Sequence, residues 1–289
     1  MMKLAGKSLL FVLFFAVFFT LTNLCYLGII AYTDVNFKKV RQSLKFDNPN
    51  FELLVLGTSF AQYGIDTEFI TSKGIKSFNL AIEGASFETS YYQLNEYLSR
   101  YSKRPFYVIL LFNTARELLM DEPFHPIIDF TMKDYHFSLK DAPIIKFKWL
   151  GTELIKKILS SKHRKARLSY GQVKFTKSTP DNTDFNDLTL NLKEIETVHW
   201  IGEIAKLCGQ NGIEIIIVGM PGFKETQNRS EIGPYRLYFN NGCSAPFYNF
   251  SSKDFCVIFD KNKDWIGNSH LNEFGANKFT QQLIRIIKD

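Results

Sequence analysis

Short apolar runs alternate with amphipathic stretches along most of the chain after about residue 50. Four runs have the length and composition of buried β-strands: 52–56, 75–81, 106–112 and 213–218. Apolar residues also recur at helical spacing over 87–101 and 192–208. Near-continuous apolar strands separated by helices are typical of a parallel sheet covered on both faces. The pattern therefore predicts a three-layer α/β sandwich with a mostly parallel sheet.

The pattern differs near the N-terminus, where residues 9–32 contain no charged side chain. A helix of this length, at about 1.5 Å per residue, spans a hydrocarbon core of about 30 Å. A cleaved signal peptide has a shorter apolar region and a small-residue cleavage site, which Ile29 to Tyr32 do not provide. We therefore expect an uncleaved transmembrane anchor with a basic juxtamembrane linker (1–45), followed by the α/β domain (46–289).

The segment from about 120 to 191 breaks the alternation. It contains four prolines, aromatic clusters and a basic, helix-like run over 152–167. Because long structureless loops are uncommon in compact domains, we expect an insertion with its own elements, which can act as a lid. The basic run is typical of a solvated helix face, and the alternative is contact with an anionic membrane surface or a glycopolymer.

Composition excludes some classes of protein. The 289 residues carry a net charge of +6, and the basic residues are spread along the chain apart from an enriched stretch at 146–177. Without a basic stripe interleaved with aromatics, we expect no nucleic-acid partner. The four cysteines lack the spacing of a metal site, so we expect no metal and no cofactor. Cys243 and Cys256 flank a polar loop and could pair in an oxidising compartment.

Candidate chemistry gathers where the predicted strands end. Ligands of open α/β sheets bind beyond the carboxyl ends of the strands, and Gly57-Thr58-Ser59 follows the first one. A serine hydroxyl becomes a nucleophile when a base removes its proton and nearby amides stabilise the oxyanion. Thr58 or Ser59 is equally suited to cap a helix. This turn alone leaves both interpretations open.

Three further positions share that rim. Asn79 to Gly84 follow the second strand, Asn113 follows the third, and His270 precedes a predicted helix at 273–287. A lone loop histidine is usually structural. Its combination with Ser59 at one rim favours a serine site.

The combination resembles the SGNH or GDSL-like hydrolase superfamily, particularly its membrane-anchored branch in cell-envelope acylation. Gly57-Thr58-Ser59-Phe60 is similar to the first block of that family. Phe78-Asn79-Leu80-Ala81, with Gly84, is similar to the second block, and Asn113 has a position comparable to the third. SHLNEFGANKF, residues 269–279, is similar to the last block and is the most specific part. The resemblance covers most of the chain after about residue 50, outside the insertion.

The resemblance implies a flavodoxin-like topology and a set of site residues. Ser59 is the nucleophile and His270 the base. The oxyanion hole consists of the Ser59 N–H, the Gly84 N–H and the Asn113 side chain, with Asn79 as a secondary candidate.

One position departs from the family pattern. The acid is expected three residues before the histidine, where this chain has Gly267. Asp264, Asp260 or a backbone carbonyl can substitute, or the site can work as a Ser-His dyad. The departure also fits a weakened or inactive relative.

The resemblance implies a membrane-anchored serine acyl-esterase or O-acyltransferase. Its expected substrate is an acyl ester, acetyl in the first instance, on a cell-envelope glycan. The alternative is a non-catalytic partner of a membrane-bound O-acyltransferase or a polysaccharide export complex.

Orientation in the membrane is open at this point. The basic residues that follow the span outnumber those that precede it: Lys38, Lys39, Arg41 and Lys45 against Lys3 and Lys7. The positive-inside rule alone therefore favours a cytoplasmic domain. The family resemblance implies the opposite, an extracytoplasmic catalytic domain.

Overall fold

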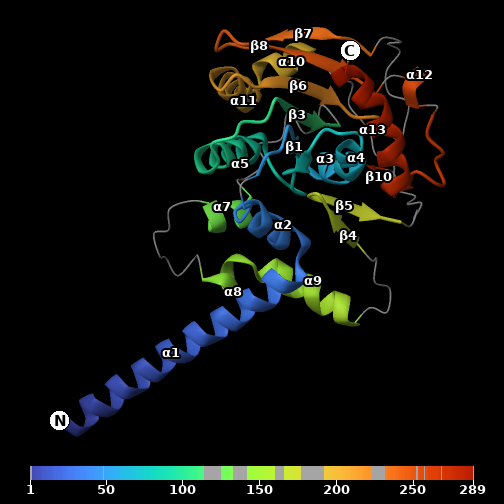
Figure 1. Ribbon diagram of the computed structural model, residues 1–289. Helices are drawn as coiled ribbons and strands as arrows, with labels where there is room; N and C mark the ends of the chain where they lie inside the picture. Colours follow the sequence, from blue (N-terminus) through green and yellow to red (C-terminus); the bar gives the residue numbers. More distant parts are fainter. Residues whose placement is uncertain are drawn as a thin grey trace.

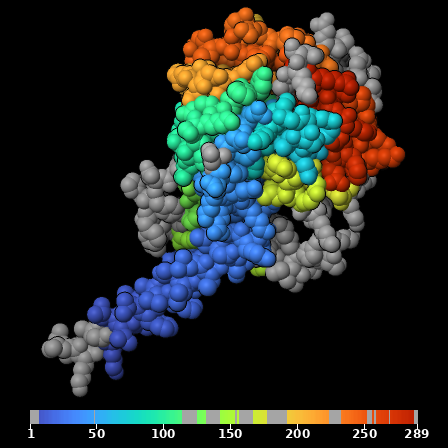
Figure 2. Space-filling view, viewed as in Figure 1, coloured from blue at the N-terminus to red at the C-terminus, as the bar shows by residue number. Residues whose placement is uncertain are grey.

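The computed structural model describes residues 2–47, 49–113, 125–132, 142–159, 166–176, 192–222, 232–251, 253–256, 258–267 and 269–288. An α/β domain occupies one end, and a group of helices lies beneath it (Figure 1). The N-terminal helix projects from this group, away from the rest of the protein (Figure 2).

The α/β domain is built on a six-stranded sheet. Its strands are β1 (Leu53–Gly57), β2 (Ser77–Asn79), β3 (Tyr107–Phe112), β6 (Glu214–Gly219), β7 (Tyr235–Tyr238) and β8 (Ser244–Asn249). The order is β2-β1-β3-β6-β8-β7, and only the β7–β8 pair is antiparallel among these neighbours. The parallel part has the flavodoxin-like order 2-1-3-4-5. The predicted fold class is confirmed.

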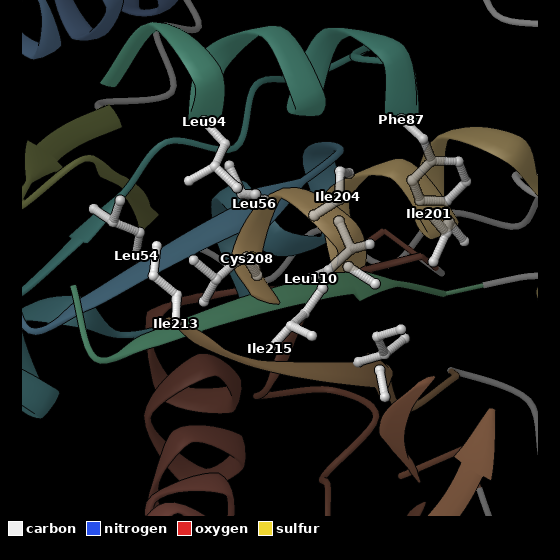
Figure 3. Close-up of a cluster of buried hydrophobic side chains, with 14 of the residues drawn as sticks. Leu54, Leu56, Phe87, Leu94, Leu110, Ile201, Ile204, Cys208, Ile213 and Ile215 are labelled. Atoms are coloured by element: carbon white, nitrogen blue, oxygen red, sulfur yellow. The ribbon is translucent and has the colours of Figure 1, made fainter. Parts of the chain in front are cut away.

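Both faces of this sheet are covered, which explains its apolar strands. On one face, α5 (Phe87–Arg100) and α11 (His199–Gln210) pack over the strands. Figure 3 shows side chains of α5 and α11 meeting those of the sheet, among them Leu94, Ile204, Leu56 and Leu110. On the other face, α3 (Ser59–Gly64), α4 (Thr67–Ser72) and α13 (Glu273–Lys288) pack over Val55, Ile109 and Val218.

Two parts of the sequence prediction differ from the structure. The helix expected over 192–208 is divided into α10 (Leu192–Thr197) and α11, because Val198 between them is extended (φ −71°, ψ 106°). Strands β7 and β8 were not expected. In β8, buried residues alternate with half-buried ones, so this strand lacks the continuous apolar run that marks the central strands.

The insertion supplies several short elements. They are α7 (Pro126–Met132), α8 (Pro143–Lys146), α9 (Lys148–Leu159), β4 (Ala166–Ser169) and β5 (Gln172–Phe175). The β4–β5 hairpin contacts α3, where Gln172 Nε2 donates to the Tyr63 carbonyl over 3.0 Å. The helices α7, α8 and α9 lie with α2 between the α/β domain and the N-terminal helix (Figure 1). We call α2, α7, α8 and α9 the helical base.

The N-terminal helix α1 (Met2–Thr33) is the long apolar element. Within it, Lys7–Thr33 has a mean hydropathy of 2.2 and is long and apolar enough to cross a membrane. The chain turns at Asp34, whose carboxylate accepts hydrogen bonds from the N–H groups of Asn36 and Phe37 and so begins α2 (Val35–Ser43). The predicted linker is therefore largely helical in the structure, and Lys39 within it is buried.

The remaining elements are α12 (Lys253–Cys256), β9 (Trp265–Ile266) and β10 (His270–Leu271). Cys243 and Cys256, which could have paired with each other, are not joined by a disulfide. Within the described ranges, no group of three or more His, Cys, Asp or Glu side chains is arranged to hold a metal ion.

Candidate active site

The turn between β1 and α3 presents Ser59 at the carboxyl end of the sheet. Gly57 has φ +132°, and a Cβ there would lie 2.2 Å from the Leu111 carbonyl oxygen, so the turn requires glycine. Thr58 is the N-cap of α3, and its side chain accepts from the Phe60 N–H over 3.4 Å. The cap is therefore Thr58, and Ser59 is the first residue of the helix with its hydroxyl available for another partner.

That partner is His270. The Nε2 atom of His270 lies 2.8 Å from Ser59 Oγ, across 211 positions of sequence. Residues Trp265–Ile266 and His270–Leu271 form a short antiparallel ladder, and Leu271 is fully buried beside α13. The hairpin thus holds the imidazole over the start of α3, within the range expected of a nucleophile and its base.

Aromatic rings surround the imidazole. Phe60 stacks on His270 with 4.6 Å between ring centroids, and Tyr63 meets the ring edge-to-face at 5.2 Å. Burial in this setting lowers the pKa of His270 from 6.5 to about 4. The ring is therefore neutral at pH 7 and able to accept a proton.

The other ring nitrogen faces a serine. Ser269 Oγ lies 2.7 Å from His270 Nδ1. If Nδ1 carries the proton and donates to Ser269, the Nε2 lone pair is free to accept the Ser59 proton. If Ser269 donates instead, Nε2–H points at Ser59 and the base is blocked. A carboxylate at this place would enforce the first arrangement, whereas a hydroxyl permits both.

Asp264, the predicted acid, has other partners. Its side chain is buried, forms an ion pair with Lys278 over 2.6 Å and accepts from the Asp260 N–H over 2.7 Å. Gly267, at the usual position of the acid, lies in the turn between β9 and β10 with φ +61°, a conformation that favours glycine. Asp264 therefore stabilises the approach to α13, and Ser269 occupies the place behind His270.

The loop of residues 80–86, which we call the Gly84 loop, follows β2. Asn79, the secondary candidate, fixes its first turn: Oδ1 accepts from the Ala81 N–H over 3.0 Å, and Nδ2 donates to the Ala61 carbonyl over 2.8 Å. The Ile82 N–H donates to the Gly57 carbonyl over 3.3 Å. Asn79 thus acts through the backbone, and the loop that carries Gly84 is tied to the Ser59 turn.

Side chains of α5, of α3 and of the residue before α7 also hold this loop. Gln93 Nε2 of α5 donates to the Leu80 carbonyl over 2.8 Å. Gln62 of α3 accepts from the Glu83 N–H and donates to Asn36 Oδ1 of α2 over 2.8 Å. Buried His125 bonds the Glu83 backbone. The backbone of the Gly84 loop is therefore fixed from several sides before any ligand binds.

Lys39 of α2 makes the least expected of these contacts. Lys39 is only 1% exposed. Its ammonium donates to the Ala81 carbonyl and lies 3.5 Å from Asn79 Oδ1. Burial lowers the pKa of Lys39 well below 10.5. Asn36 and Lys39 together join the helix that follows the apolar segment to the Gly84 loop.

Asn113, the third predicted oxyanion donor, follows β3 directly and is buried. Gly57 pairs with Leu111 in the register of β1 and β3, so Asn113 comes two residues beyond that pair on the strand next to Ser59. Ser59, Gly84 and Asn113 thus follow three adjacent strands at one edge of the sheet.

Sequence reasoning missed Ser269, Gln62 and Lys39. Ser269 adjoins His270, but its role follows from the β9–β10 turn, which the sequence did not indicate. Lys39 lies in a basic run that predicts a linker, and a lysine in such a run gives no sign of burial. A helical spacing of Asn36, Phe37 and Val40 was the available signal, since all three are buried on α2.

No known protein family matches the sequence, and no curated protein matches it. Among solved structures, the chain is similar to a Bacteroides fragilis protein described as an acylhydrolase, with 11% identity and a TM-score of 0.40, covering 86% of this chain and 93% of that one. It is also similar to a Streptococcus pneumoniae protein described as a platelet activating factor, with 11% identity and a TM-score of 0.39, covering 87% and 90%. Likeness at this level identifies neither a family nor an activity, so function is inferred from the geometry of the site.

We predict that His270 titrates near pH 4 rather than near its ordinary 6.5. Because its pKa is lowered in the folded protein, the unfolded chain takes up the proton first, and stability falls as the pH drops from about 6.5 towards about 4. Histidine NMR shifts, assigned with His270→Gln, measure the midpoint directly. A His270 midpoint at or above 6.5 would contradict the assignment of the ring environment.

We also predict that Lys39→Met loosens the Gly84 loop without unfolding the protein. The substitution removes the hydrogen bond to the Ala81 carbonyl, worth about 1 kcal/mol, and also relieves the cost of burying an ammonium. Amide hydrogen exchange in a peptide spanning 80–87 is expected to quicken about five- to tenfold, with little loss in the thermal midpoint. Lys38→Met, at the exposed neighbouring lysine, is the matched control. Equal exchange in the two variants would refute a role for Lys39 in holding the loop.

Proposed function

We propose that this protein is a serine acyl-ester hydrolase or O-acyltransferase whose nucleophile is Ser59 and whose base is His270. The observation that carries the proposal is the 2.8 Å contact between His270 Nε2 and Ser59 Oγ at the carboxyl end of a parallel sheet. The neutral state of His270 at pH 7 supports it, because only the neutral ring accepts a proton.

The first half-reaction forms an acyl-enzyme. His270 Nε2 takes the Ser59 proton while Oγ bonds to the ester carbonyl carbon. The resulting oxyanion accepts hydrogen bonds from the Ser59 and Gly84 N–H groups and the Asn113 side chain, each of which lowers the barrier. The C–O bond to the alcohol then breaks, and His270 returns the proton to the departing alcohol oxygen.

The second half-reaction releases the acyl group. Water or an acceptor hydroxyl gives its proton to His270 and attacks the acyl carbon. The Ser59–acyl bond breaks, and His270 protonates Ser59 Oγ. Water yields a carboxylic acid, and a sugar hydroxyl yields a new ester.

The proposal also covers the location of the protein and its substrate. The apolar helix is proposed to anchor the protein in the cell membrane with its α/β domain outside the cytoplasm. The proposed substrate is an acylated, in the first instance acetylated, glycan of the cell envelope. The motifs at Ser59, Gly84 and His270 support this assignment through their resemblance to the membrane-anchored SGNH branch.

A second candidate function has one observation in its favour. Ser269, a neutral hydroxyl, faces His270 Nδ1 where a carboxylate would stabilise the imidazolium formed during catalysis. A chain with this site can retain the fold as a partner of a membrane-bound O-acyltransferase or export complex, with little chemistry of its own.

We expect a fluorophosphonate probe to label the detergent-solubilised full chain at Ser59. Ser59→Ala should abolish labelling, because the probe reacts with an activated serine. His270→Ala should slow labelling at least about 100-fold, the usual contribution of a general base. Gel fluorescence over time measures the rates.

Ser99→Ala, at an exposed serine near the end of α5, is the matched control and should label as the unaltered chain does. If the folded chain does not label while its near-ultraviolet circular dichroism is intact, the catalytic proposal fails and the partner function is favoured.

A further inference from the structure

The helical base has an outward face that the proposed chemistry does not use. Among the described side chains of α8 and α9, four large apolar ones are exposed: Ile144, Ile145, Trp149 and Ile155. Trp149 is 40% exposed and Ile155 57% exposed. Ile145 lies on α8, and Trp149 and Ile155 lie six positions apart on α9, about 120° around its axis. Exposed Lys148 and Thr152 lie between them on this outward side of α9.

The opposite face of the same elements is packed. Phe147 and Leu150 are buried in a cluster with Ile30 of α1 and Phe37 of α2. Phe147 meets Phe37 edge-to-face with 5.0 Å between centroids. The elements therefore carry apolar side chains on both sides: one side packs in the protein, and the other, flanked by Lys148, is turned outward.

Their attachment to α1 lies inside the apolar span, not beyond it. The Ile144 N–H donates to Asn23 Oδ1 over 3.0 Å, and the Tyr26 hydroxyl donates to the Phe147 carbonyl over 2.6 Å. At about 1.5 Å per residue, Asn23 lies about 15 Å before the end of α1 at Thr33. Because about 20 residues cross a hydrocarbon core of about 30 Å, a span that begins at Lys7 reaches the far surface of the core near Tyr26. If α1 crosses a bilayer in this way, its contact with Phe147 holds α8 and the start of α9 at the depth of that surface.

We propose that the outward face of α8 and α9, residues 144–155, is a second membrane-binding surface. It inserts Ile145, Trp149 and Ile155 into the interfacial region of the bilayer that α1 crosses, while Lys148 meets the headgroups. Exposed tryptophan and lysine side chains suit this region, which accommodates both an apolar body and a polar end. The inference rests on the membrane anchoring in the proposed function, and it is independent of Ser59 chemistry.

Two attachments would fix the height and tilt of the α/β domain above the bilayer. A single helix followed by a flexible linker would let the domain rotate freely. Here Asp34 begins α2 immediately after α1, and the helical base packs on both. The site would therefore be held at a constant height and orientation relative to the membrane surface.

Tryptophan fluorescence of the full chain in phosphatidylcholine vesicles tests this surface. The chain has three tryptophans: Trp149, half-buried Trp200 on α11, and Trp265, which is buried. Phospholipids brominated on their acyl chains quench tryptophans that contact them. We expect quenching in the unaltered chain and in the matched control Trp200→Phe, and loss of most of it in Trp149→Phe.

Three outcomes would overturn the inference. Quenching of Trp149 by aqueous iodide but not by brominated lipid would show that this face lies in water. Shielding from both quenchers would show that a second copy of the chain covers it. If the chain does not float with the vesicles after treatment with alkaline carbonate, α1 is not a membrane anchor, and the inference fails with it. Fluorophosphonate labelling at Ser59, measured in the same vesicles, keeps the serine chemistry distinguishable from each of these outcomes.

Discussion

The hydrogen bond between Ser59 and His270 is the interaction on which the functional account depends. It joins the first parallel strand to a hairpin 211 positions later, and both ends are held by packing. Gly57 permits the sharp turn into α3, and Thr58 caps the helix so that Ser59 is left to face the imidazole. On the other side, buried Leu271 and the β9–β10 ladder fix His270. The pair is thus assembled by the fold before any substrate arrives.

The Gly84 loop connects this pair to the helical base and the end of α1. Its backbone accepts hydrogen bonds from Gln93 of α5 and from Lys39 of the helical base. Ile82 and Ala85 of the same loop belong to the apolar cluster that contains Ile30 at the end of α1. Burying an ammonium costs free energy. The buried Lys39 donates to the Ala81 carbonyl and so holds the loop in place. The end of the apolar helix α1 and the loop that carries Gly84 therefore share one packed layer.

The fold could be predicted from the sequence where buried elements leave a clear pattern of apolar residues. The central strands are covered on both faces, so their apolar runs indicated β1, β3 and β6, whereas half-buried β8 left no such run. Ser59 and His270 were found because short motifs surround them. Ser269 and Lys39 were not, since their roles arise from a hairpin turn and from the packing of α2, both of which are tertiary features. Asp264 is close to His270 in the sequence, which predicts it as the acid, but its carboxylate forms an ion pair with Lys278.

The central claim is that Ser59 carries the acyl group between two half-reactions, and mass mapping after a short reaction tests it most directly. The full chain is mixed with p-nitrophenyl acetate, stopped in acid within the first turnovers, digested and analysed by tandem mass spectrometry. The account predicts one acetylated residue, Ser59, and no acetyl on that peptide in His270→Ala at the same time point. Acetylation confined to lysines, or equal acetylation of Ser59 with and without His270, would contradict it.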